Sequence, residues 1–183
     1  MRDIKLNSIL FSNSKIAETE RYLGEDLETP TITFLIGPPA SGKSTWVSKY
    51  GKGALIISRD DLVDKMRKPY GWSYSETFKH PEFQKKVNDV LKTRISKVLN
   101  SGKDIIVDMT NMTKKGRMRI LNKVPTNYLK NAVVFNVGRD ELIRRLKKRK
   151  DETGKEVSLD IVDKMISYFQ MPTAGEFDNI TII

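Results

Sequence analysis

Eight consecutive residues carry the clearest chemical signal in the chain. Gly37-Pro-Pro-Ala-Ser-Gly-Lys-Ser44 fits the pattern G-x-x-x-x-G-K-S, with an apolar segment before it and a helical pattern after it. Glycines allow backbone angles that turn successive amides toward phosphates, and a helix N-terminus adds partial positive charge. In such a loop the lysine, here Lys43, reaches the β- and γ-phosphates, and the Ser44 hydroxyl ligates magnesium. The motif predicts a site for a nucleoside triphosphate and Mg2+.

The predicted nucleotide site takes in the whole loop and one residue beyond it. A glycine-rich turn that matches the pattern by chance is the alternative, and the flanking strand and helix patterns disfavour it. The residues expected to contact the nucleotide are Gly37, Pro38, Pro39, Ala40, Ser41, Gly42, Lys43, Ser44 and Thr45.

Two adjacent carboxylates follow the next apolar segment. Ser58 and Asp61 are three residues apart and fit a capping box, with Asp in place of the usual Glu, so Asp61 is expected to serve the helix start. Asp60 is then left to face the cleft, where it would accept the proton of an attacking hydroxyl. The alternative is that both carboxylates only favour the helix dipole.

A third carboxylate ends an apolar run. Asp108 follows Ile105-Ile-Val107, the usual form of a Walker B carboxylate that holds magnesium directly or through water, unless it simply ends a strand at a turn. Thr110 and Asn111 are expected to orient neighbouring loops or to cap the next helix.

Residues 144–150 form a dense basic run. By default such a run is a solvated face or a patch for anions. Arg145 and Arg149 are four residues apart, so they share one helical face and would close over the γ-phosphate as a lid. The glycine- and charge-rich residues 151–156 would let that lid move.

Strand and helix patterns alternate from Thr31 to the end of the chain. This alternation predicts an α/β domain, a doubly wound and mostly parallel five-stranded sheet of the P-loop NTPase/kinase fold. The strands are expected at 31–36, 54–57, 104–107, 132–137 and 180–183, and the helices at 43–50, 59–67, 81–99, 114–121, 140–150 and 158–170.

Composition limits the class of protein further. The 183 residues fit one domain, which we assign to residues 30–183, after an N-terminal extension over residues 1–29 with a short helix near 15–23. There is no cysteine, and the single His80 fits a helix entry beside Pro81 better than a catalytic role. No signal segment or membrane span is evident, so we expect a cytoplasmic protein. The net charge of +10 exceeds what one triphosphate requires and fits equally well lysines on solvated faces or a polyanionic partner such as nucleic acid.

Together these residues resemble the phage-type polynucleotide 5′-hydroxyl kinase group of P-loop kinases. The resemblance covers about residues 31–183 and is carried by the motifs at 37–46, 58–61, 108–111 and 141–149, and by the tail at 171–179. It implies transfer of the ATP γ-phosphoryl group to a 5′-hydroxyl of RNA or DNA, by a kinase-only enzyme of nucleic-acid repair. It also implies that Asp60 is the general base and that Lys43, Arg145 and Arg149 stabilise charge.

The acceptor side departs from that group. Phage-type members carry an arginine for the acceptor phosphate where this chain has Val63. We therefore predict that Arg59 and Arg67 contact the acceptor, with Arg117 and Arg119 as weaker candidates. The aromatic residues Tyr70, Trp72 and Tyr74 are expected either to stack on a nucleobase or to cover the core. A small-molecule kinase for a nucleotide, nucleoside, sugar or antibiotic is the alternative, and a nucleotide-dependent binding module is a third possibility.

Overall fold

The computed structural model describes residues 29–183, and the helix expected near 15–23 lies outside that range. The described residues form one parallel sheet of five strands in the order β2-β3-β1-β4-β5. The strands are β1 (Thr31–Ile36), β2 (Leu55–Ser58), β3 (Ile105–Asp108), β4 (Leu129–Val134) and β5 (Asn179–Ile182). Because every strand runs the same way, all their carboxyl ends meet at one edge of the sheet. The predicted fold class is confirmed, with a sheet that is wholly parallel.

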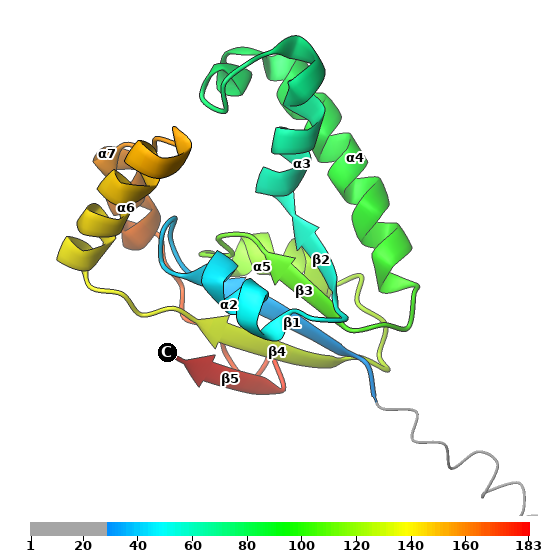
Figure 1. Ribbon diagram of the computed structural model, residues 1–183. Coiled ribbons are helices and arrows are strands. Elements are labelled where there is room, and N and C mark those ends of the chain that lie inside the picture. The colour runs from blue at the N-terminus through cyan, green and yellow to red at the C-terminus, as the bar shows by residue number, and fades with distance from the viewer. Residues whose placement is uncertain (1–28) are drawn as a thin grey trace, which may run out of the picture.

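Helices cover the sheet and rise past its carboxyl edge (Figure 1). They are α2 (Lys43–Tyr50), α3 (Arg59–Arg67), α4 (Pro81–Leu99), α5 (Lys114–Leu121), α6 (Arg139–Thr153) and α7 (Leu159–Ser167), with short 3-10 turns at Lys68–Tyr70 and Glu76–Lys79. In Figure 1, α3 and α4 project together on one side, and α6 and α7 lie beyond the arrow tip of β4. No helix within residues 29–183 is long and apolar enough to cross a membrane.

Each face of the sheet packs a different set of helices. Alternate residues of β1 separate the two sides, since Phe34 joins the larger core with α3, α4 and α5 while Leu35 joins the smaller core beneath α2. Trp46 and Val47 of α2 pack against that smaller core. The central strands β1 and β3 are therefore largely buried, as their continuous apolar sequences require, whereas the edge strand β5 is exposed along its length.

The largest differences from the predicted element boundaries are three residues, and they occur at β4, at the end of α6 and at the end of α7, which stops at Ser167 instead of 170. The strand expected at 132–137 is β4 at Leu129–Val134, because its ladder follows β1 from Thr31 to Ile36 and ends where β1 ends. The basic helix expected to stop at 150 continues as α6 to Thr153 and is closed by Gly154 in the left-handed conformation at φ 67°. The segment predicted to be a flexible hinge is thus partly helical.

A buried ion pair fixes α5 to the segment that follows α7. Arg117 is fully buried, and its guanidinium donates to Glu176 from Nε (2.8 Å) and Nη2 (3.0 Å). Its Nη1 donates to the carbonyls of Asn111 (3.1 Å) and Gln170 (2.8 Å). Burial alone would raise the pKa of Glu176, but the hydrogen bonds from Arg117 hold it below its usual value.

The prediction that Arg117 contacts the acceptor is therefore wrong. All of its donor groups that reach a partner do so inside the protein, and its side chain has no exposed surface. The sequence could not show this, because an arginine on an amphipathic helix reads the same whether it turns inward or outward.

We expect Arg117→Met to lower the free energy of unfolding by about 3 to 5 kcal/mol, because it leaves the Glu176 carboxylate buried without its partner. Urea unfolding followed by circular dichroism measures this. Arg119→Met, on the exposed face of the same helix, is the control and should change stability by less than about 0.5 kcal/mol. A stable Arg117→Met protein with weakened acceptor binding would contradict the structural role.

Candidate active site

Hydrogen bonds join the end of β1 to the loop after β3. The amide of Gly37 donates to the carbonyl of Thr110 (3.0 Å), and the buried Asn111 side chain donates to the carbonyls of Leu35 (2.8 Å) and Val107 (3.1 Å). Asn111 itself adopts φ 50°, a backbone conformation that asparagine tolerates better than most residues. Asn111 was expected either to orient neighbouring loops or to cap the next helix, and these hydrogen bonds fit the first role. The cap of α5 comes from Thr113, which accepts from the amide of Gly116 (3.1 Å).

The loop at 37–44 has the backbone that a phosphate cradle needs. Ala40 and Gly42 have positive φ angles of 62° and 109°, which turn the chain sharply before α2 begins. A side chain at Gly37 has no room, because its Cβ would lie 2.6 Å from the Ser41 hydroxyl oxygen. Lys43 folds back over the loop and donates to the carbonyls of Gly37 (2.9 Å) and Pro38 (2.7 Å).

Opposite charges gather around this loop. Burial lowers the pKa of Lys43 to about 8, against the opposing attraction of Asp108 and Asp60. Burial likewise raises the pKa of Asp108, which Lys43 opposes, while Asp61 and Asp60 add to the rise. These mutual effects mean that the carboxylates following β2 and β3 lie in the electrostatic field of the loop lysine. The sequence predicted this convergence at the carboxyl edge of the sheet.

Two oxygen donors in this cluster suit a magnesium ion. The Asp108 carboxylate and the Ser44 hydroxyl make no hydrogen bond or ion pair with other side chains in residues 29–183, so both are free to bind a cation. Mg2+ typically takes one or two protein oxygens and completes its shell with phosphate and water. That preference agrees with the described residues, where no group of at least three His, Asp or Glu side chains could hold a metal alone.

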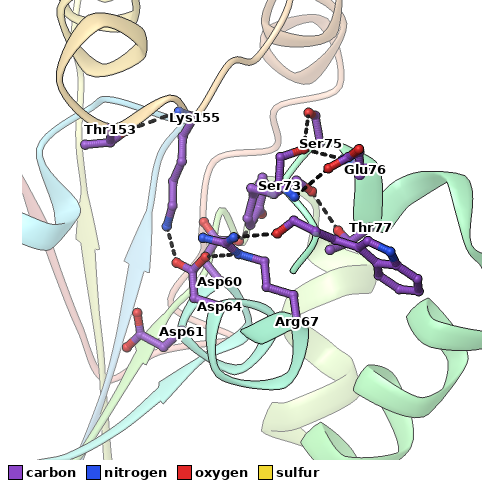
Figure 2. A network of polar contacts seen from close by, with 12 residues as sticks. Asp60, Asp61, Asp64, Arg67, Ser73, Ser75, Glu76, Thr77, Thr153 and Lys155 are labelled. Carbon is purple, nitrogen blue, oxygen red and sulfur yellow. Dashed lines mark hydrogen bonds and ion pairs between the residues drawn. The ribbon is translucent and has the colours of Figure 1, made fainter. Parts of the chain in front are cut away.

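The adjacent aspartates differ in their surroundings. The Ser58 hydroxyl caps α3 by accepting from the amide of Asp61 (3.2 Å), but the Asp61 carboxylate does not return a bond within the described chain. Asp is one methylene shorter than the Glu of a full capping box, so only half of the predicted box forms. Asp61 points away from the polar network that surrounds Asp60 and Asp64 (Figure 2).

Asp60 carries contacts on both carboxylate oxygens. The hydroxyl of Tyr74 donates to Oδ1 (2.7 Å), and Nη2 of Arg149 lies 3.9 Å from Oδ2. The Asp60 side chain is still 53% exposed, so a substrate hydroxyl can reach it. This geometry suits a base held in one orientation at the mouth of the site.

The two predicted lid arginines bridge different parts of the site. Arg145 pairs with Glu141 (2.7 Å) and donates to the carbonyl of Ser41 in the phosphate-binding loop (3.2 Å). Arg149, one turn further along α6, faces Asp60 instead. Helix α6 therefore crosses from the loop to α3 and places one guanidinium near each.

The other two acceptor candidates make hydrogen bonds to neighbouring residues of the protein. Arg59 donates to Gln84 (2.5 Å) and Asn88 (3.2 Å) of α4, and Arg67 donates to Asp64 (2.8 Å) and to the carbonyl of Trp72 (2.6 Å). These contacts tie α3 to α4 and to the following loop. Both arginines are only half-buried, so their contact with an acceptor remains a prediction.

The position that departs from the phage-type pattern lies inside the core. Val63 is fully buried against α4, so that turn of α3 faces inward. A phosphate-binding side chain cannot act from there. An acceptor phosphate would therefore be held from another position.

The aromatic loop packs mainly on itself and the core. Trp72 stacks on Tyr70 (4.5 Å between ring centroids) and on His80 (3.8 Å), with Phe83 at its edge (5.6 Å). This arrangement favours core covering over base stacking for Trp72. His80 directly precedes Pro81 at the start of α4, as predicted. Tyr74 differs, because its hydroxyl reaches Asp60.

A groove of about 630 Å³ adjoins the loop after β3, between α4, α5 and the end of α7. We call it the α4–α5 groove. Its floor is apolar, with Ile95, Ile120, Met112 and Met165, and it carries three cations, Lys92, Arg119 and Lys123. Arg119 and Lys123 make no ion pair or side-chain hydrogen bond within residues 29–183, whereas Lys92 pairs with Asp89 (3.2 Å).

The sequence held a weak signal for these groove cations. Arg119 and Lys123 are four residues apart at the end of α5, so they share one face of that helix. Sequence reasoning gave Arg119 only a minor role and passed over Lys92 and Lys123. Solvated lysines have the same pattern, and only the placement of α4 and α5 on either side of the groove brings these three together.

The fold and the loop geometry define a nucleotide-binding P-loop domain of the kinase type. The chain belongs to the AAA_33 family, described as an AAA domain, whose family model matches residues 32–172. Heterogeneous nuclear ribonucleoprotein U-like protein 2 of Mus musculus is 25% identical over 169 residues, covering 85% of this chain and 22% of that protein. The chain thus spans about a fifth of the length of the curated relatives it matches.

Solved structures share the fold at low identity. A chain of the Pnkp1/Rnl/Hen1 RNA repair complex superposes with a TM-score of 0.63 at 21% identity, covering 76% of this chain and 44% of that chain. A putative kinase from Chloroflexus aurantiacus superposes with a TM-score of 0.62 at 17% identity, with 85% of each chain covered. At these identities the similarity establishes the fold alone.

We expect Ser58→Ala to lower the free energy of unfolding by about 1 kcal/mol, because it removes the side-chain cap of α3. Asp61→Asn should cost less than about 0.5 kcal/mol, since the Asp61 carboxylate completes no capping bond. Thermal unfolding of both variants measures the difference. A larger loss of stability for Asp61→Asn than for Ser58→Ala would contradict this and indicate that the full capping box forms.

Proposed function

We propose that this chain transfers the γ-phosphoryl group of ATP to the 5′-hydroxyl end of RNA or DNA. The observation that carries the proposal is the placement of Asp60. This exposed carboxylate is oriented by Tyr74, faces Arg149, and lies in the field of the phosphate-loop lysine Lys43. A carboxylate base beside a triphosphate cradle is the arrangement that a hydroxyl kinase requires.

The donor side of the reaction follows from the loop and the lid. Lys43 would exchange its loop carbonyls for the β- and γ-phosphate oxygens, while the amides of residues 37–44 would hold the phosphate chain. Ser44 and Asp108 would hold Mg2+, which supplies charge neutralisation between the β- and γ-phosphates when bound. Arg145 and Arg149 would stabilise the charge that develops on the transferred group.

The acceptor side uses Asp60 as the base. Its carboxylate takes the proton of the acceptor hydroxyl as that oxygen bonds to the γ-phosphorus. The bond from the γ-phosphorus to the bridging oxygen breaks, and ADP leaves with the electron pair. Because Arg149 lies near the same carboxylate, it is placed between the base and the charge that it would stabilise.

The α4–α5 groove supports a polynucleotide acceptor. Its unpaired cations suit a phosphate backbone, and its apolar floor suits bases or sugars. The groove also shares Thr110 with the phosphate-binding loop, since the Thr110 carbonyl accepts from the Gly37 amide. The names of the similar proteins, a ribonucleoprotein and a member of an RNA repair complex, add support for RNA.

A small-molecule kinase remains the alternative, because its donor site would be the same. A nucleotide-dependent RNA-binding module is a third candidate, and the oriented Asp60 disfavours it since binding alone needs no base. The three are separated by a transfer assay from γ-labelled ATP. The acceptors to compare are 5′-hydroxyl RNA and DNA oligonucleotides, the same oligonucleotides with a 5′-phosphate, and a panel of nucleosides, nucleotides and sugars.

In this assay we expect label on 5′-hydroxyl oligonucleotides and none on the 5′-phosphate controls. Asp60→Asn should lower turnover by roughly a hundredfold to ten-thousandfold, because it removes the base, while ATP binding stays unchanged. Asp61→Asn on the same helix is the matched control. Label that reaches only nucleosides or sugars would establish the alternative. A larger loss for Asp61→Asn would mean that the two aspartates are reversed.

Acceptor affinity should fall steeply as salt rises, because phosphate contacts release counterions. Arg119→Ala and Lys123→Ala should each weaken oligonucleotide binding and reduce the logarithmic salt slope by about one. Lys52→Ala, exposed near the opposite edge of the sheet, is the control and should leave the slope unchanged. Fluorescence anisotropy with labelled oligonucleotides at several salt concentrations measures this. An unchanged slope in both groove variants would remove the groove from the acceptor site.

A further inference from the structure

The hydrogen bond from Tyr74 to Asp60 restricts the orientation of the Asp60 carboxylate. A carboxylate at the first turn of a helix rotates freely unless something holds it, and Asp60 is half exposed. The Tyr74 hydroxyl donates to Oδ1 at 2.7 Å, which fixes the plane of the carboxylate and leaves Oδ2 on the side of Arg149. Burial, with the nearby negative charge of Asp60 adding to it, raises the pKa of Tyr74, so the phenol remains a donor.

Tyr74 is itself held rigidly by the loop that carries it. Its carbonyl accepts from the hydroxyl of Thr77 (2.7 Å), whose side chain is fully buried, and the Thr77 carbonyl accepts from Gln84 of α4 (2.8 Å). The Tyr74 ring also meets Phe78 edge-on at 5.4 Å. The hydroxyl is therefore presented to Asp60 by a loop anchored on α4.

A lysine just after the lid helix reaches the same place. Lys155 forms an ion pair with Asp64, and its ammonium lies 5.1 Å from the centroid of the Tyr74 ring (Figure 2). Asp64 also accepts from Arg67, which in turn donates to the carbonyl of Trp72. Although burial opposes it, these hydrogen bonds from Lys155 and Arg67 lower the pKa of Asp64 and so favour its carboxylate form.

These contacts link both carboxylate oxygens of Asp60 to the lid segment, Oδ2 through Arg149 and Oδ1 through Tyr74 and Lys155. Arg149 near Oδ2 and Lys155 over the Tyr74 ring come from one continuous segment, because α6 ends at Thr153 and Gly154 turns the chain back. In this arrangement the segment places a guanidinium on one side of Asp60 and an ammonium over the tyrosine ring on the other. Ion pairs and a cation–π contact at partly buried positions suit such a docking contact.

We propose that Tyr74 is a positioning residue for the base Asp60, and that Lys155 docks the segment after α6 onto Asp64 and Tyr74 so that Asp60 is oriented when the lid is closed. This inference rests on the proposed function. It assigns Tyr74 no contact with substrate. From the sequence, the aromatic residues at 70–74 were expected either to stack on a nucleobase or to cover the core. Tyr74 instead gains a role in aligning Asp60.

The test compares single and double variants in the transfer assay. Tyr74→Phe keeps the ring and removes the hydroxyl, and we expect turnover to fall about tenfold while the KM for ATP stays within about twofold. Introduced into Asp60→Asn, the same substitution should cause no further loss, because the group that it positions is already gone. Tyr70→Phe, whose hydroxyl makes no bond within residues 29–183, is the matched control and should behave as the wild type.

The docking role of Lys155 has its own readout. Lys155→Met keeps the aliphatic stem and should lower turnover several-fold while speeding amide hydrogen exchange at residues 154–158. Lys148→Met, which removes only an exposed pair with Glu152, is the control and should change neither quantity. Unchanged exchange in Lys155→Met would overturn the docking role.

The outcomes separate this inference from the proposed function. If the wild type transfers no label, or if Asp60→Asn is fully active, the proposed function has failed. If Asp60→Asn is impaired but Tyr74→Phe lowers turnover equally with and without it, the proposed function stands and the positioning role is overturned. Full activity of Tyr74→Phe overturns the positioning role as well.

Discussion

The candidate site depends on the hydrogen bonds that join the end of β1 to the loop after β3. Asn111 donates across two strand ends at once, and Gly37 donates to Thr110, so the phosphate-binding loop and Asp108 cannot move independently. The Arg117 guanidinium donates to the Asn111 carbonyl, and Glu176 neutralises its charge. A buried polar junction of this kind is stable because each of its donors finds an acceptor.

A second constraint is the balance of charge at the carboxyl edge. Burial lowers the pKa of Lys43, while the carboxylates of Asp108 and Asp60 favour its charged form. A bound triphosphate with Mg2+ would add further negative and positive charges beside these groups, and the predicted lid arginines would add positive charge to them. The lid and α3 are held together by further pairs of opposite charge, among them Lys155 with Asp64. Charge complementarity therefore serves both the donor site and the closure above it.

The arginines illustrate how one residue type divides between structure and chemistry. Arg117 and Arg59 hold helices in place, whereas Arg145 and Arg149 face the phosphate-binding loop and Asp60. A guanidinium offers five donors in a rigid plane, so it suits the fixing of carbonyls and carboxylates inside a protein as well as the binding of phosphate. The identity of the residue gives no indication of which use applies.

The sequence alone determined the phosphate-binding loop, the alternation of strands and helices, and the convergence of Asp60 and Asp108 on that loop. These follow from local patterns, because glycine spacing, apolar periodicity and the position of a residue after a strand are all readable along the chain. Only the tertiary structure decided that Arg117 is buried, that Tyr74 holds Asp60, and that Arg119 and Lys123 share a groove with Lys92. Those facts depend on which faces of distant helices pack together, and a helix face is chosen by its partner as much as by its own residues.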